Sequence, residues 1–189
     1  MNSPDFTELT LLREDLAYHQ TRVLLLVDAV ARADGHDHRL DGLTKLAKLD
    51  FLVRYPALAP LILEALHADD YRLHLTEEDT HMPTSVEAPM MRHKYGPWDD
   101  RYYPVIGALV GRGLLRYADK RRGHVALVPT AAGRRLVRSL SDGDAWHEIR
   151  ERCEAVAETS GGLSGYALKQ LIYQRLDNLM DRPHREVIQ

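Results

Sequence analysis

The chain has very little cysteine and no long apolar run. Cys153 is the only cysteine among 189 residues, so the chain can form neither an internal disulfide nor a zinc site built on several thiolates. No stretch approaches the roughly 20 consecutive apolar residues that span a bilayer. The first residues, MNSPDFTEL, lack the basic and then apolar layout of a signal peptide. We therefore expect a cytoplasmic protein that makes no membrane contact.

The fingerprints of common catalytic sites are also missing. The sequence contains neither the GxxxxGK[ST] phosphate loop nor the GxGxxG dinucleotide motif. The serines of residues 160–165 lie between two expected helices, not on the strand-to-helix elbow of a hydrolase. Residues 34–38 include metal-ligating types, but their spacing suits a turn better than a tetrahedral site, and His74 and His81 have no partner at a fixed spacing. We expect no enzyme activity, no cofactor and no bound metal.

Positive charge is concentrated in the middle of the chain. Residues 92–138 hold 11 Lys and Arg against 3 Asp and Glu, whereas residues 1–91 hold 8 against 16 and residues 139–189 hold 6 against 9. A local excess of this size attracts phosphate groups. The same region could instead pair with the acidic front of the chain, within one molecule or between subunits. The sequence leaves both alternatives open.

Hydrophobic periodicity and turn residues predict a mainly α-helical protein with one small β-hairpin. Asp41 and Thr130 are expected to cap the helices that follow them. An acidic stretch at 69–91 has the composition of a loop. The predicted elements, in chain order, are helices over 21–33, 42–55, 58–68 and 96–113, a hairpin over 114–117 and 125–129, and helices over 131–140, 145–158 and 164–181.

Three helices, a basic hairpin and a further helix follow one another in the order of a winged helix-turn-helix fold. We predict an N-terminal arm at 1–20, a winged-helix domain at 21–140 that contains the acidic loop, and a C-terminal two-helix extension at 141–189. In this fold the third helix can enter the DNA major groove while the tip of the hairpin, the wing, contacts the DNA backbone.

Basic side chains on and around the wing are the candidate DNA contacts. Three are consecutive at the wing tip, where they cannot pack into a core and are suited to phosphate contact. Asp99 and Asp100, early in the third predicted helix, would repel phosphates, which favours contact without base recognition. A solvated helix face is the alternative for the arginines after the wing. The predicted DNA-binding residues are Arg92, Lys94, Arg101, Lys120, Arg121, Arg122, Arg134, Arg135 and Arg138.

Two groups of aromatic and apolar side chains are candidates for contact with a protein partner. One flanks the Gly96-Pro97 turn, where packing at the start of a helix is the alternative. The other recurs at helical spacing in the last predicted helix, where packing on the winged-helix domain is the alternative to a partner-binding arm. The predicted partner-binding residues are Tyr95, Trp98, Tyr166, Leu168, Ile172 and Tyr173.

Three phrases of the sequence together resemble one family. They are LDGLTKLAKLDFLVRYP at 40–56, MRHKYGPWDDRYYPVIGALVGRGLL at 91–115 and LKQLIYQRLDNL at 168–179. They are similar to the middle components of bacterial ABC-three-component anti-phage defence systems, small winged-helix proteins encoded beside an SMC-like or Rad50-like coiled-coil ATPase. The KYGPW segment is also similar to the SocA-like antitoxin domain.

The resemblance implies a partner more than a reaction. A middle component would be an adaptor subunit that sits on the ATPase or links it to an effector subunit, as a homodimer or within a hetero-complex. Its basic wing would contact DNA without sequence preference. The alternative is a free-standing winged-helix transcriptional regulator that binds an operator as a dimer. The resemblance assigns no chemistry to individual residues.

Overall fold

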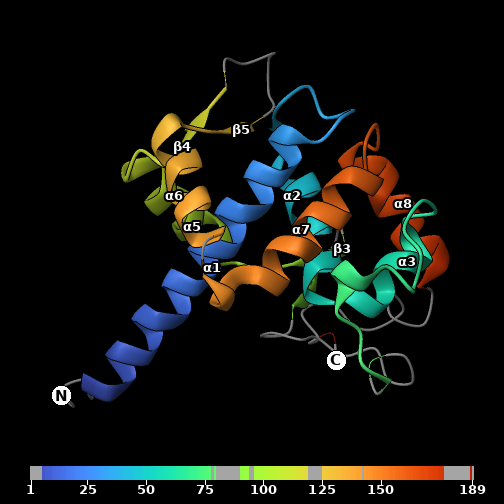
Figure 1. Cartoon of the computed structure of the whole chain (residues 1–189), viewed down its shortest axis with the longest axis horizontal. Helices are drawn as coiled ribbons and strands as arrows, with labels where there is room; N and C mark the ends of the chain where they lie inside the picture. The colour runs from blue at the N-terminus through green and yellow to red at the C-terminus, as the bar shows by residue number, and fades with distance from the viewer. Residues whose placement is uncertain are drawn as a thin grey trace.

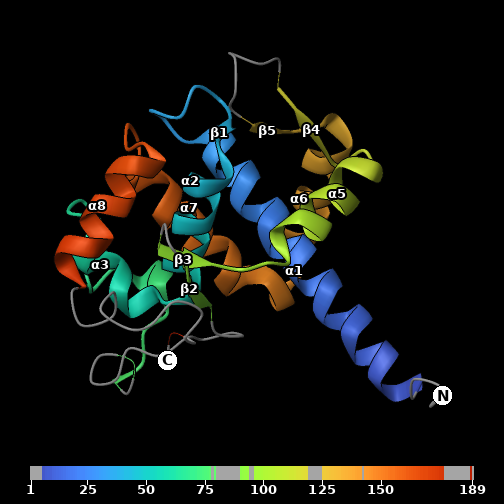
Figure 2. The same ribbon diagram turned by 180° about the vertical axis from the view of Figure 1, so that it is seen from behind.

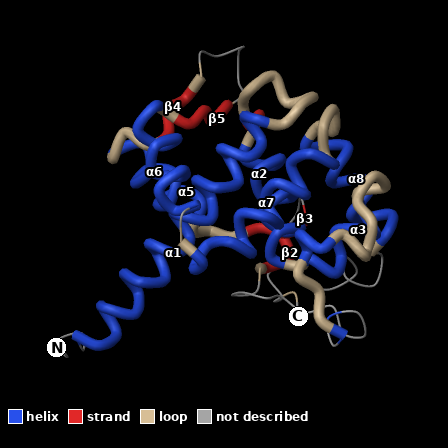
Figure 3. Tube along the Cα trace, in the orientation of Figure 1, coloured by secondary structure: helices blue, strands red, loops and turns tan. Residues whose placement is uncertain are grey.

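One long helix, α1 (Phe6–Arg32), organises the fold (Figure 1). The computed structural model describes residues 6–77, 79, 90–93, 96–118, 125–141, 143–176 and 188. The other α-helices within these residues are α2 (Leu43–Arg54), α3 (Ala59–Ile62), α5 (Tyr102–Gly111), α6 (Ala131–Ser141), α7 (His147–Thr159) and α8 (Gly165–Arg175). The strands and short 3-10 helices (Figure 3 colours the strands) are β1 (Leu40–Asp41), β2 (Met91–His93), β3 (Gly96–Trp98), β4 (Leu115–Tyr117), β5 (Ala126–Pro129), η1 (Pro56–Leu58), η2 (Tyr71–Leu73) and η3 (Asp144–Trp146).

The C-terminal half of α1 is the centre of the hydrophobic core. From Val23 to Val30, every apolar side chain is at most 3 % exposed. A helix that is apolar on all sides needs partners on all sides. Figures 1 and 2 show α5 and α6 on one side of α1 and α2, α3 and α8 on the other, and α7 packs along it. The N-terminal half of α1 extends away from the body, with no break at the predicted boundary near residue 20.

A three-stranded antiparallel sheet in the order β1-β5-β4 completes the winged-helix topology. β4 and β5 form the predicted hairpin, and Leu40 of β1 pairs with Leu127 of β5. The fold is therefore mainly α-helical with a small hairpin, as predicted. Thr130 also caps α6 as predicted, since its Oγ1 accepts a hydrogen bond from the Gly133 amide at 3.0 Å.

The third helix of the motif, α5, begins later than predicted. Residues Gly96–Trp98 are not helical but form β3, which pairs with β2 in a separate two-stranded sheet. Gly96 has a φ of 98°, a conformation that glycine adopts readily and other residues rarely. The Lys48 side chain lies beside Gly96, where a Cβ would come within 3.1 Å of its Cε. Tertiary packing against α2 thus overrides the helical signal of the Gly-Pro turn, and α5 starts at Tyr102.

Two further predictions about helix boundaries are wrong. Asp41 lies in β1 and does not cap α2, whose N-cap is Gly42 with a φ of 87°. The helix predicted over 58–68 is reduced to η1 and the single turn of α3, because Leu63 is extended. The extended backbone lets Ile62, Leu63 and Leu66 all reach the core.

Both predicted C-terminal helices are present, but α8 ends at Arg175, whereas the prediction extends to residue 181, and residues 177–181 lie outside the described part of the chain. α7 and α8 are separated by the turn at 160–164, and Ser164 Oγ caps α8 by accepting a hydrogen bond from the Ala167 amide at 3.1 Å. α8 does not project from the body but packs on α2 and α3.

Candidate functional site

A buried polar network joins α1, α2 and α5. The Asp50 carboxylate accepts hydrogen bonds from Arg22 Nε and from the Tyr102 hydroxyl, each at 2.7 Å, and Arg54 Nη1 lies 3.5 Å from it. Arg54 Nη1 also donates to Asp99 Oδ2 at 2.8 Å. A helix-turn-helix usually joins its two helices by a short turn. Here residues 55–101 intervene between α2 and α5. The buried network therefore takes the place of a short turn in fixing the position of α5 relative to α2.

The network fixes the protonation of its members. Burial alone would raise the pKa of Asp50, but the Arg22 and Arg54 guanidiniums lower it below its ordinary value. Burial opposes the same shift at Asp99, whose pKa is lowered mainly by hydrogen bonds from Arg101 and Arg54. Burial and the Asp50 charge raise the pKa of Tyr102 well above its usual value. At neutral pH both carboxylates are therefore ionised and the phenol is protonated.

The predicted DNA contact Arg101 belongs to this network. Its Nε and Nη2 donate to the two carboxylate oxygens of Asp99 at 2.9 and 2.8 Å. This bidentate contact uses the guanidinium N–H groups with which an arginine would bind a phosphate. Arg101 is thus held by Asp99, and Asp99 itself is a buried structural acid, not a solvent-facing charge on a recognition helix.

A small basic groove of about 230 Å³ lies between α1, α6 and α7. We call it the α6 groove. Its two acidic side chains are already paired: Arg32 donates to Asp28 at 2.8 Å and to Glu154 at 3.2 Å, and Arg150 lies 3.6 Å from Glu154. The lining residues are Asp28, Arg32, Arg134, Val137, Arg138, Ser141, Arg150 and Glu154. Four arginines against two acids leave the groove with a positive charge.

The predicted arginines of α6 supply the unpaired charge. Arg134, Arg135 and Arg138 are exposed, and none makes a hydrogen bond or ion pair with another described residue. Sequence reasoning found these three but missed Arg32 and Arg150, which reach the groove from other helices. Each of the two has an acid four residues away, which is typical of a solvated surface pair and gives no sign of a shared groove.

The exposed face of α5 carries no charge. Its solvent-exposed residues are Tyr103, Pro104, Gly107 and Gly111. Apart from the Tyr103 hydroxyl, this face has no side-chain donor or acceptor that could contact a base edge. The helix that reads DNA in many winged-helix proteins is therefore unsuited to base recognition here.

The remaining predicted DNA contacts are placed only in part. Arg92 is half-buried on β2. Lys94 lies outside the described residues, as do the wing-tip residues Lys120, Arg121 and Arg122. Their use as phosphate contacts stays a prediction.

The predicted partner-binding residues divide between core and surface. Leu168 and Ile172 are fully buried within the chain, which is the intramolecular packing weighed as their alternative. Tyr166 is 70 % exposed, and Tyr173 is half-buried. Trp98 is half-buried and packs edge-on against Tyr102, as expected for packing near the start of a helix. Tyr95 lies outside the described residues.

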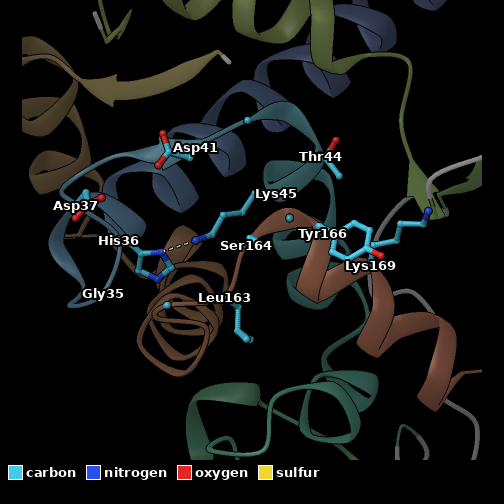
Figure 4. A pocket seen from close by; sticks show the side chains of 13 residues that line it. Gly35, His36, Asp37, Asp41, Thr44, Lys45, Leu163, Ser164, Tyr166 and Lys169 are labelled. Carbon is cyan, nitrogen blue, oxygen red and sulfur yellow. Dashed lines mark hydrogen bonds between the residues drawn. The ribbon is translucent and has the colours of Figure 1, made fainter. Parts of the chain in front are cut away.

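A larger cavity of about 710 Å³ separates the α1–β1 loop from the start of α8 (Figure 4). His36 Nδ1 faces Lys45 Nζ at 3.0 Å across it, and His36 Nε2 lies 2.8 Å from the Ala157 carbonyl oxygen. Burial lowers the pKa of both His36 and Lys45. Both ring nitrogens of His36 therefore have protein partners. Two aspartates and two lysines line the cavity, so the lining favours neither sign of ligand charge.

Lys48 of α2 is a buried lysine beside β3. Its Nζ donates to the Pro97 carbonyl oxygen at 3.2 Å, and burial together with the Lys169 charge lowers its pKa to about 7. The unfolded value is about 10.4, so the unfolded chain binds more protons between these two pH values. The contribution of Lys48 to stability is therefore highest above pH 10 and is lost as pH falls through 7.

We expect Lys48→Met to raise the free energy of unfolding at pH 6, because the variant buries no ammonium group. The gain should shrink by about 1.4 kcal/mol per pH unit between pH 7 and 10, because in this range Lys48 is neutral in the folded wild type but still protonated in the unfolded chain. Urea denaturation at several pH values measures it. Parallel pH profiles for the two proteins would contradict the lowered pKa.

Comparisons of the chain with protein-family models, with curated proteins and with solved structures find no match in any of the three. Among the helices that the structure describes, none is long and apolar enough to cross a bilayer. Within the described residues, the α6 groove is positively charged and the exposed face of α5 is uncharged.

Proposed function

We propose that this chain is a non-catalytic adaptor subunit of an SMC-like ATPase defence complex and contacts DNA without reading its sequence. The observation that carries the DNA contact is the group of three exposed arginines on α6, none of which is paired with another described residue. The ATPase partner rests on the sequence resemblance to middle components of ABC-three-component systems.

The α6 arginines suit phosphate contact for electrostatic reasons. Arg134 and Arg138 border a groove whose two acids are paired with Arg32 and Arg150, so among the described residues their own charges have no partner. A DNA backbone would supply that charge and release condensed counterions, which gives an affinity that falls steeply with salt. Phosphate contacts of this kind position a protein on DNA but carry no sequence information.

The α5 face supports a protein partner over an operator. Tyr103 is 63 % exposed beside Pro104 and two glycines that have open space above them. Tyrosine is enriched and charge is depleted at the centres of protein interfaces. A regulator would instead present side chains that hydrogen-bond to base edges, typically Arg, Lys, Asn or Gln.

Fluorescence anisotropy on several unrelated duplexes tests the DNA contact. We expect similar affinities on every duplex and a linear fall of log K with log salt from about 50 to 200 mM. The triple variant Arg134→Gln, Arg135→Gln, Arg138→Gln should bind more weakly, with a salt slope smaller by up to about 3, because each lost phosphate contact removes about 0.9.

A matched variant controls for net charge. Arg39→Gln, Lys169→Gln and Arg175→Gln together remove three positive charges from other elements and should leave the slope nearly unchanged. A preference of about 10³-fold for one duplex would favour the operator-binding regulator. A triple α6 variant that binds as the wild type does would remove α6 from the interface.

The same proteins have a second readout for the adaptor role. Mixed with the SMC-like ATPase that the resemblance places beside it, the wild-type chain should co-elute in size-exclusion chromatography. The triple α6 variant should co-elute equally well, because the proposal assigns those arginines to DNA. Failure of the wild-type chain to form the complex would contradict the adaptor role while leaving the DNA result intact.

A further inference from the structure

Three potential metal ligands from two elements meet beside α7, away from the α6 groove. Glu151 Oε2 lies 2.6 Å from His74 Nε2 and 3.3 Å from His147 Nε2. One ligand atom from each residue lies within 4.8 Å of the other two. The Glu151 side chain is 12 % exposed and the His147 side chain 50 % exposed, so the cluster is anchored at its base and open to solvent at one side.

The segment that carries His74 is tied to α7 independently of the cluster. Arg152 Nε of α7 donates to the Leu73 carbonyl oxygen at 3.0 Å. Arg72 Nη1 donates to Glu158 Oε2, also on α7, at 2.6 Å. These two contacts hold η2 against α7 through α7 residues that follow the cluster, so His74 is kept near Glu151 without the help of a metal ion.

The backbone presents the three side chains toward one point. His147 and Glu151 are one helical turn apart on α7 and share a face of it. His74, which ends η2, has a φ of 51° and a ψ of 44°, a left-handed conformation that a non-glycine residue adopts rarely. Residues held in such conformations are over-represented at ligand sites.

Two imidazoles and one carboxylate form the ligand set of a zinc ion with an open fourth position. With zinc–ligand distances of ~2.0–2.1 Å, neighbouring ligand atoms of a tetrahedral site lie about 3.3 Å apart. His147 Nε2 and Glu151 Oε2 already have this separation, and the His74–Glu151 contact must lengthen by only about 0.7 Å. The half-exposed side leaves room for water as the fourth ligand.

The charges around the cluster are compatible with a divalent cation. Arg152 is occupied by the Leu73 carbonyl and by Glu148 at 3.1 Å. Arg150 Nη2 lies 3.4 Å from His147 Nδ1, an exposed contact that is given up when Nδ1 carries the proton and Nε2 binds the ion. Metal binding requires neutral imidazoles whose Nε2 atoms carry no proton.

We propose that His74, His147 and Glu151 bind one Zn²⁺ ion, which clips η2 to α7. The ion replaces the hydrogen bonds within the cluster by coordinate bonds and leaves one position for water. The site does not depend on the proposed DNA or ATPase contacts, so zinc binding can be tested independently of them.

Isothermal titration calorimetry with ZnCl₂ on the untagged full chain at pH 7.5 tests the site. We expect one equivalent to bind with a dissociation constant in the low micromolar range or below. His74→Ala, His147→Ala and Glu151→Gln should each weaken binding by at least about 10-fold. Co²⁺ in place of Zn²⁺ should give the visible absorption of a tetrahedral complex, and that absorption should be lost in the same variants.

His67→Ala is the matched control, because His67 is exposed and is not one of the three clustered ligand residues. It should bind Zn²⁺ as the wild type does. His147→Ala removes a half-exposed side chain, so circular dichroism should show a folded protein in which weaker binding is attributable to the lost ligand. Absence of saturable binding by the wild type, or equal binding by wild type and His147→Ala, would overturn the proposal.

Discussion

Asp50→Asn will lower the free energy of unfolding by about 3–5 kcal/mol, the usual result of removing one partner from a buried ion pair. Asp50 is 0 % exposed and compensates two buried guanidiniums, those of Arg22 and Arg54. With the carboxylate gone, Arg22 loses the counter-charge that its Nε contacts at 2.7 Å. Chemical denaturation at pH 7 measures the loss, and it is the largest we expect from any single isosteric change in this chain.

Asp69→Asn provides the control, because Asp69 is exposed and its replacement should change stability by less than about 0.5 kcal/mol. Acid supplies an additional check. The pKa of Asp50 in the folded protein lies below its unfolded value of about 3.9, so its contribution is present above that value and is lost as pH falls through the folded one. The difference between wild type and variant should therefore narrow in acid. A loss below about 1 kcal/mol at pH 7 would mean that the network does not hold α2 and α5 together.

Gly133→Ala will destabilise the protein by about 1–3 kcal/mol, although alanine is the better helix former. A Cβ at Gly133 would overlap the Leu114 carbonyl oxygen, a backbone atom that also accepts a hydrogen bond from the Thr130 amide at 3.0 Å. The clash can be relieved only by moving α6 away from the hairpin. Arg134 and Arg135 follow directly, so DNA affinity should fall along with the melting temperature.

Gly107→Ala should have the opposite sign. Gly107 lies within α5, and a Cβ there would meet nothing within 4 Å. Alanine has less conformational freedom than glycine in the unfolded chain, so the substitution stabilises the protein by about 0.5–1 kcal/mol. Equal effects of the two substitutions on the free energy of unfolding would show that helix propensity, and not the contact with Leu114, sets the result at Gly133.

The elements that the sequence predicts correctly are those whose signals are local. The hairpin and the Thr130 cap depend on residues within a few positions of one another, and both are confirmed. β1 and β3 could not be found in this way. β1 is two residues long and exists because it pairs with β5, and β3 is held by β2 and by Lys48 from α2. Apolar residues over 58–68 do have helical spacing, but the backbone is extended after Ile62, and this extended segment brings the later apolar residues to the core.

The candidate sites follow the same rule. The α6 arginines stand in one helix and were visible as a basic run, whereas Arg32 and Arg150 join them only through packing of α1 and α7. For the proposed zinc site the sequence contains one local signal, the spacing of His147 and Glu151 by four residues, which is common on solvated helices. His74 lies far away in sequence and became a candidate only when η2 was seen against α7.

The placement of α1 at the centre has a consequence for synthesis on the ribosome. Its apolar residues from Val23 to Val30 need α5, α6 and α7 as cover, and all three are encoded later in the chain. The strand that follows α1 must also wait for Leu127 before it can pair. At a translation rate of about 5–20 residues per second, α1 is outside the ribosomal exit tunnel for several seconds while its apolar residues are still exposed. This order makes the nascent chain a natural client for holding chaperones and delays the native contacts of α1 until α7 has been synthesised.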